Sequence, residues 1–128
     1  MVQQISEGVS VTVETFYQGA QSNPLRSDYL FAYRITIENL SSLTLQLLNR
    51  HWIIVDSCRL TREVKGEGVV GRQPVLEPNA SYQYVSAVNL NSDIGKMYGQ
   101  YTMIDLSQQK TFQVAIPEFA LIAPFKFN

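Results

Sequence analysis

Residues 29–39 read YLFAYRITIEN, and along the whole stretch large apolar side chains alternate with a second set. The first set is Tyr29, Phe31, Tyr33, Ile35 and Ile37, and the second is Leu30, Ala32, Arg34, Thr36 and Glu38. Successive side chains of a β-strand point to opposite faces, so the alternation predicts a half-buried strand with Arg34, Thr36 and Glu38 in solvent. This is the longest strand signal in the chain, and it indicates a protein built from sheets.

The segments on either side repeat this period of two. Val9, Val11 and Val13 alternate with polar residues, and 44–56 (TLQLLNRHWIIVD) predicts a bent strand or a strand pair around Trp52. Further strands are predicted at 59–64, 82–88, 97–105 and 111–116, followed by an apolar tail at 119–127. No stretch keeps a helical apolar spacing, and about eight short antiparallel strands at intervals of roughly 8–12 residues predict an all-β protein.

A local signature at 76–82 (LEPNASY) narrows the fold to an immunoglobulin-like β-sandwich. In such sandwiches a tyrosine near the start of a late strand hydrogen-bonds back to the upstream backbone, and Tyr82 stands at that position. Pro78 fixes φ for the turn, and Asn79 tolerates a left-handed backbone. The alternative is an ordinary turn before a strand. Without a linker or repeat, 1–128 is expected to be a single domain.

Composition limits the classes of function. The net charge of −1 and pI of about 5.7 provide no broad basic surface, so no nucleic-acid partner is expected. The apolar stretches fall short of the ~20 residues that a membrane span needs, so no membrane insertion is expected. The lone Cys58 suits a reducing compartment, and the start MVQQISEGVS resembles no signal peptide. These features predict a soluble cytoplasmic protein.

The stretch 65–72 (KGEGVVGR) carries glycines at the spacing G-x-G-x-x-G: Gly66, Gly68 and Gly71. In a dinucleotide site such glycines join a strand to a helix whose N-terminus holds the pyrophosphate. Here Pro74 and Pro78 would interrupt a following helix, and no Gly-Lys-Ser/Thr ends the run. The sequence therefore predicts no dinucleotide fold and no P-loop.

Three interpretations of the glycine run stay open. The glycines can supply positive φ or close backbone approach at a hairpin or bulge. The run can also form a partner-binding loop. Finally, its amides can form an anion-binding nest, which Lys65 and Arg72 would strengthen and Glu67 would weaken. The candidate site for a phosphate-type anion comprises Lys65, Gly66, Gly68, Gly71 and Arg72.

Groups for catalysis or metal binding are scarce. His51 is the single histidine and Cys58 the single cysteine, and no acidic residues follow a calcium-loop spacing. His51 could serve as a general base and Ser57 or Cys58 as a nucleophile, yet no nucleophile motif surrounds them. We expect no catalytic residues, no metal site, no cofactor and no enzymatic activity. A histidine on a strand face is the simpler interpretation of His51.

Several segments together resemble the ApaG family along nearly the whole chain. They are YLFAYRITIEN, LLNRHWIIVD, EVKGEGVVGRQPVLEP, SYQYVSAV, GQYTMID and IPEFAL. His51 stands where many members have tyrosine, and Asn79 where glycine is frequent. The resemblance implies a fibronectin type III-like β-sandwich and a small stand-alone bacterial protein. It also implies a biochemical activity that is unsettled, in a family whose name has been associated with cobalt and magnesium tolerance.

Two functions follow as hypotheses. The resemblance extends to eukaryotic domains carried by an F-box protein and a polymerase delta-interacting protein, which implies a protein-interaction role. We therefore expect a non-enzymatic soluble binding module for an unidentified protein partner. The alternative is a small-anion binder for pyrophosphate or a nucleotide phosphate at Gly66–Gly71, an idea the family's glycine run has prompted. The apolar tail with Phe119, Phe125 and Phe127 could also support a homodimer.

Overall fold

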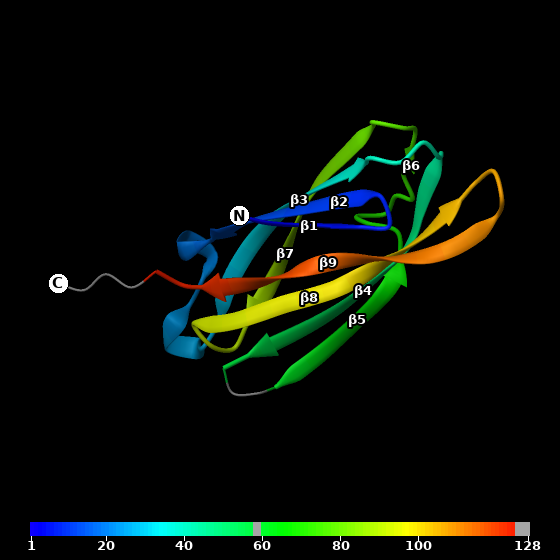
Figure 1. The fold of residues 1–128 in the computed structure, drawn as a ribbon. Helices are drawn as coiled ribbons and strands as arrows, with labels where there is room; N and C mark the ends of the chain where they lie inside the picture. Colours follow the sequence, from blue (N-terminus) through cyan, green and yellow to red (C-terminus); the bar gives the residue numbers. More distant parts are fainter. Residues whose placement is uncertain (58–59, 125–128) are drawn as a thin grey trace.

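The computed structural model describes residues 1–57 and 60–124 and is built almost entirely from antiparallel strands (Figure 1). Two 3-10 turns, η1 (Gly19–Gln21) and η2 (Pro24–Arg26), lie between the second and third strands. The strands are β1 (Val2–Ser6), β2 (Val9–Tyr17), β3 (Tyr29–Asn39), β4 (Leu45–Asp56), β5 (Thr61–Glu67), β6 (Val75–Leu76), β7 (Ser81–Leu90), β8 (Ile94–Asp105) and β9 (Lys110–Ile122).

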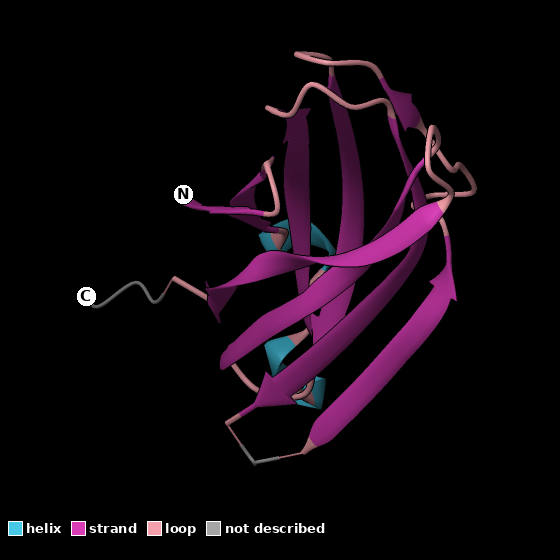
Figure 2. Cartoon of the chain, turned by 45° about the vertical axis from the view of Figure 1, so that its right-hand side comes forward, coloured by secondary structure: helices cyan, strands magenta, loops and turns pink. Residues whose placement is uncertain are grey.

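These strands form two sheets that face each other as the layers of a sandwich (Figure 2). One sheet has the order β1-β2-β3-β7, and the other has the order β5-β4-β8-β9 with the short β6 paired to β4. Every pairing is antiparallel. The predicted all-β sandwich is confirmed.

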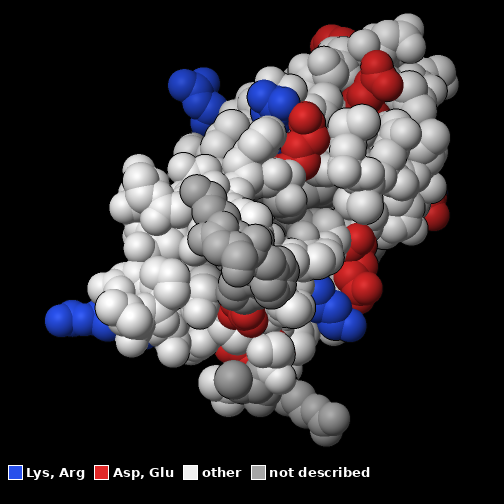
Figure 3. Space-filling model, turned by 90° about the vertical axis from the view of Figure 1, so that its left-hand side faces the viewer, with Lys and Arg blue, Asp and Glu red and all other residues white. Residues whose placement is uncertain are grey.

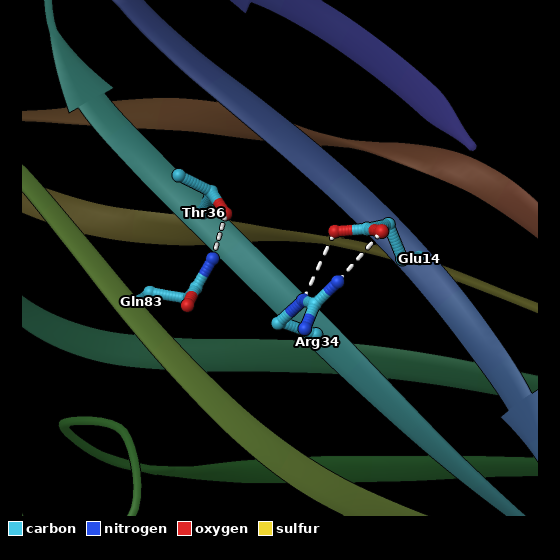
Figure 4. Close-up of polar contacts among 4 residues, drawn as sticks. All are labelled: Glu14, Arg34, Thr36 and Gln83. Carbon is cyan, nitrogen blue, oxygen red and sulfur yellow. Dashed lines mark hydrogen bonds and ion pairs between the residues drawn. The ribbon is translucent and has the colours of Figure 1, made fainter.

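The alternation in β3 sets which residues enter the core. Phe31, Tyr33, Ile35 and Ile37 are buried between the sheets, as their period of two predicts. On the outer face, Arg34 holds Glu14 of β2 and Thr36 accepts a hydrogen bond from Gln83 of β7 (Figure 4). β3 is thus an interior strand whose two faces differ as its sequence indicated.

Strand β4 is one bent strand, which settles the choice between a bent strand and a strand pair. Its register with β8 shifts between Leu47 and Asn49, so one extra residue forms a bulge. The bulge changes the parity of the side chains: Leu47 faces the core before it, and Trp52 and Ile54 face the core after it. Arg50 shares this inward parity.

Trp52 anchors the aromatic core between the sheets. It is 3% exposed, and its ring centroid lies 5.6 Å from Tyr33, 6.5 Å from Tyr101 and 5.9 Å from Phe119. All three contacts are edge-on, an arrangement that aromatic quadrupoles favour. Phe119 of the apolar tail therefore packs in the core, as part of β9. Phe125, Phe127 and Cys58 lie outside the described residues.

The corner before β7 is held differently from the expectation. Asn79 has a φ of +68°, the predicted left-handed backbone. The Tyr82 hydroxyl, however, has no hydrogen-bond partner among the described residues, so the proposed tyrosine corner is absent from this part of the chain. Instead the buried Asn39 amide donates to the carbonyls of Leu43 (2.7 Å) and Leu76 (3.0 Å). A side chain from β3 thus ties down the turn.

The two open sides of the sandwich are unlike. On one side β1 and β9 lie next to each other, and the Ala115 amide donates to the Ser6 hydroxyl at 2.9 Å (Figure 1). On the other side the edge strands β5 and β7 border an inter-sheet pocket. Arg62 of β5 donates to the Asn89 carbonyl of β7 across this opening. The candidate site lies here.

Candidate functional site

The glycine run ends β5 and forms a tight hairpin. The Val69 amide donates to the Arg72 carbonyl at 2.8 Å, and the Arg72 amide donates back to the Val69 carbonyl at 3.0 Å. The two residues between them both have positive φ, +48° at Val70 and +76° at Gly71, which is the backbone of a type I′ turn. No helix follows, so the predicted absence of a dinucleotide-binding strand-to-helix turn is confirmed.

Two of the glycines lie in close contact with other residues, Gly68 with backbone and Gly66 with the end of a side chain. A methyl group at Gly68 would collide with the Arg72 carbonyl oxygen, and the φ of Gly68 is +63°. A methyl group at Gly66 would lie 2.8 to 2.9 Å from three atoms of the Arg50 guanidinium. Gly68 lets the hairpin close, and Gly66 makes room for Arg50 from the neighbouring strand β4.

Many amides of the run donate within the protein. Besides the Val69 and Arg72 amides, the Gly68 amide donates to the Leu48 carbonyl at 2.7 Å, next to the bulge of β4. Lys65 pairs with Glu63 (Nζ to Oε1, 3.0 Å), and Arg72 is exposed at the hairpin. The anion nest at Lys65, Gly66, Gly68, Gly71 and Arg72 stays a prediction.

Arg50 is the residue of this region that the sequence reasoning missed. Register places it across from Gly66 on β5 and from Tyr101 on β8. Its Nη1 donates to the carbonyls of Glu67 (2.9 Å) and Gly68 (3.0 Å), so it holds the end of β5. A signal was available, because counting by two from the core residue Trp52 places Arg50 on the core-facing side.

The pocket beside Arg50 lies between the sheets and has a volume of about 280 Å³. Its polar lining comes from three strands that are distant in sequence: Tyr33 of β3, Arg50 of β4, and Tyr84 and Ser86 of β7. Apolar side chains complete the wall, among them Val64, Val69, Val70, Val88 and Met97. The pocket therefore combines one fixed cation and several hydroxyls with low-dielectric walls.

The tyrosines at this pocket are held in the neutral form. Burial raises the pKa of Tyr33, and the Ser86 side chain and the Arg50 charge oppose that shift. Burial likewise raises the pKa of Tyr84, and it raises the pKa of the fully buried Tyr101 well above its usual value. The hydroxyls of Tyr84 and Tyr101 are hydrogen-bonded to each other. Neutral phenols keep a proton to donate to a ligand.

A second cleft lies on the other side of Arg50, with a volume of about 430 Å³. It is lined by Arg50, His51, Lys65, Gly66 and Glu67 together with polar residues of β8 and β9. His51 sits on a strand face, as expected, with Nε2 3.3 Å from Glu63 Oε1. The Lys65 ammonium is the main cause that lowers the pKa of Glu63.

Other kinds of site receive no support from the geometry. Among residues 1–57 and 60–124, no group of three His, Cys, Asp or Glu side chains comes together to hold a metal ion. Within the same residues, no helix has the length and apolar character to cross a membrane. On the face that Figure 3 draws, Lys and Arg are interspersed with Asp and Glu.

Comparisons with known proteins agree on one family. The model of the ApaG domain matches residues 19–105. Protein ApaG of Brucella suis is 45% identical over 124 residues, which cover 97% of this chain and 95% of that protein. Protein ApaG of Edwardsiella ictaluri is 41% identical over 120 residues, covering 94% and 95%.

A solved structure shows the same fold. The crystal structure of a Bordetella pertussis protein named ApaA matches with a TM-score of 0.87 at 39% identity, covering 92% of this chain and 95% of that chain. The names of these relatives specify no catalytic activity.

Proposed function

The chain belongs to the ApaG family, and from that premise we propose that it is a non-enzymatic binding module whose β7 edge takes up an extended segment of a partner protein. The observation that carries the proposal is the character of β7. It spans ten residues, SYQYVSAVNL, and pairs with β3 along one edge while no described strand pairs with the other. An unpaired edge offers a row of backbone donors and acceptors to another chain.

Strand β7 lacks the features by which proteins usually protect a sheet edge. It contains no Asp, Glu, Lys, Arg or Pro. The other edges of the two sheets differ. β5 carries Arg62, Glu63, Lys65 and Glu67, and β9 carries Lys110, Glu118 and Pro117 beside a register shift. β1 is short and lies against β9. A long uncharged edge left open is a recurring route to strand addition.

The surroundings of β7 suit an incoming strand. Ser86, Ala87 and Val88 line the inter-sheet pocket, so alternate side chains of an added strand would reach its mouth. Val70 also lines this pocket and is 62% exposed. Its φ of +48° is unfavourable for a β-branched residue. Retained strain of this kind is common at binding sites. Backbone pairing would supply affinity, and the pocket would supply specificity.

A matched pair of substitutions tests the proposal. Peptides would be selected from a random library displayed on phage, and their affinity measured for the wild type, Val85→Lys and Ile5→Lys. Val85 on β7 is 57% exposed and Ile5 on β1 is 59% exposed, so both changes add a charge at an equally exposed edge position. We expect Val85→Lys to abolish binding and Ile5→Lys to preserve it. Equal effects, or no selectable peptide, would count against the β7 edge.

A further inference from the structure

Three of the five N–H groups of the Arg50 guanidinium donate no hydrogen bond within the described residues. Nη1 donates hydrogen bonds to the carbonyls of Glu67 and Gly68. Within the described part of the chain, Nε and Nη2 donate no hydrogen bond and no carboxylate forms an ion pair with Arg50. The edge formed by Nε and Nη2 is the fork that binds a carboxylate or phosphate with two parallel hydrogen bonds.

Arg34 shows what this fork does when an anion is present. Its Nε and Nη2 donate to the two oxygens of Glu14 at 3.0 and 2.8 Å on the outer face of the other sheet (Figure 4). Arg34 therefore has its counter-charge within the chain. Arg50 has the core-facing parity of β4, and among the described residues its hydrogen-bond acceptors are carbonyl oxygens, which neutralise no charge.

The surroundings of Arg50 would strengthen the binding of an anion. The guanidinium borders a pocket whose other polar groups, Tyr33, Tyr84 and Ser86, carry hydroxyls that can donate. The apolar wall lowers the local dielectric constant, so a charge-assisted hydrogen bond there is stronger than in water. Arg50 is half-buried, and partial removal of a guanidinium from water without a counter-charge is unfavourable, so a bound anion would relieve that cost.

We propose that Arg50, together with the hydroxyls of Tyr33 and Tyr84, forms an oxyanion-binding site in the inter-sheet pocket. The ligand group is a carboxylate or a phosphate, and it comes either from an acidic side chain or from a free phosphate-type anion. This site differs from the predicted nest, because its cation is Arg50 and neither Lys65 nor Arg72. It stands independently of the β7 edge, since a free anion can fill it without an added strand.

The first readout uses the unmodified protein. The ¹⁵N-labelled chain would be titrated separately with glutarate, which mimics a glutamate side chain, and with inorganic pyrophosphate, while the Arg50 Nε signal is followed by NMR. We expect a saturable shift of Arg50 Nε with at least one probe. Saturation by glutarate alone identifies an acidic side chain as the natural source, and tighter binding of pyrophosphate identifies a free phosphate-type anion.

Variants then locate the site. Arg50→Lys keeps the charge and loses the fork, so we expect affinity to fall about tenfold. Lys65→Gln and Arg72→Gln remove the two flanking charges, and we expect each to change affinity less than Arg50→Lys does. Trp52 fluorescence checks that each variant is folded. The inference is overturned if the Arg50 Nε signal does not shift with either glutarate or pyrophosphate. It is also overturned if Lys65→Gln and Arg72→Gln abolish binding while Arg50→Lys retains it.

Discussion

Arg50 on β4 lies over Gly66 on β5, so closely that any side chain at Gly66 would meet the guanidinium. Gly66→Ala should displace Arg50 and break its hydrogen bonds to the Glu67 and Gly68 carbonyls. We expect the free energy of unfolding to fall by about 1–3 kcal/mol. The measurement is a double-mutant cycle in urea. Once Arg50→Ala has removed the guanidinium, Gly66→Ala should cost nothing further, and additive losses would show that the two residues are not coupled.

Alanine substitutions at Gly68 and Gly71 distinguish the effect of backbone conformation on stability from the effect of steric crowding. Both have positive φ, but a methyl group at Gly71 would meet nothing within 4 Å, whereas at Gly68 it would meet the Arg72 carbonyl. We expect Gly71→Ala to cost about 1 kcal/mol through φ alone. Gly68→Ala should add about 1–3 kcal/mol for overpacking. Equal losses in thermal or urea unfolding would mean that the hairpin is looser than the structure indicates.

Val70→Asn should stabilise the protein. Asn-Gly is the preferred pair for a type I′ turn, and valine at a φ of +48° is unfavourable. We expect a gain of about 1 kcal/mol in the free energy of unfolding. Val75→Asn makes the same chemical change at an exposed valine with ordinary backbone and should bring no gain. If Val70 also contacts the partner, the stabilised variant will bind the selected peptides more weakly.

The buried tyrosines predict a loss of stability in alkali. In the folded state the pKa values of Tyr33, Tyr84 and Tyr101 are raised, so above about pH 10 the unfolded chain releases protons that the folded chain keeps. The stabilisation is complete below that pH and declines as the pH rises toward the folded pKa values. Each tyrosine should contribute a slope of up to about 1.4 kcal/mol per pH unit.

Urea unfolding followed by Trp52 fluorescence at successive pH values measures this slope. Tyr33→Phe should reduce it, and Tyr98→Phe, on a tyrosine that is 38% exposed, is the matched control for removing a hydroxyl. A free energy of unfolding that stays constant through pH 10 and above would contradict the assigned burial of these phenols.

Much of the fold was predictable because it rests on local periodicity. The alternation in β3 correctly predicted which of its side chains enter the core. β1 was missed because VQQIS has no regular alternation and depends on pairing with β2. Its signal was the following Glu7-Gly8, whose positive φ values form a hairpin turn.

The candidate site was harder to predict, because it depends on a bulge and on contacts between distant segments. Counting by two from Trp52 gives Arg50 its inward parity, but no local pattern marks the bulge between Leu47 and Asn49, which separates that parity from the one set by Leu47. Tyr33, Arg50 and Tyr84 meet only after two sheets stack. The glycine spacing pointed to the correct region of the chain. The structural role of these glycines is to form the hairpin and to leave room for Arg50.

Amide hydrogen exchange along β7, with and without a library-selected peptide, tests most directly whether this edge is the binding surface. In the free chain, the amides of Ser81–Leu90 that face away from β3 should exchange faster than those bonded to it. We expect the peptide to slow the exchange of these outward amides in alternation, as an added strand would. Protection that appears elsewhere while β7 is unchanged would contradict the proposal that this edge is the binding surface.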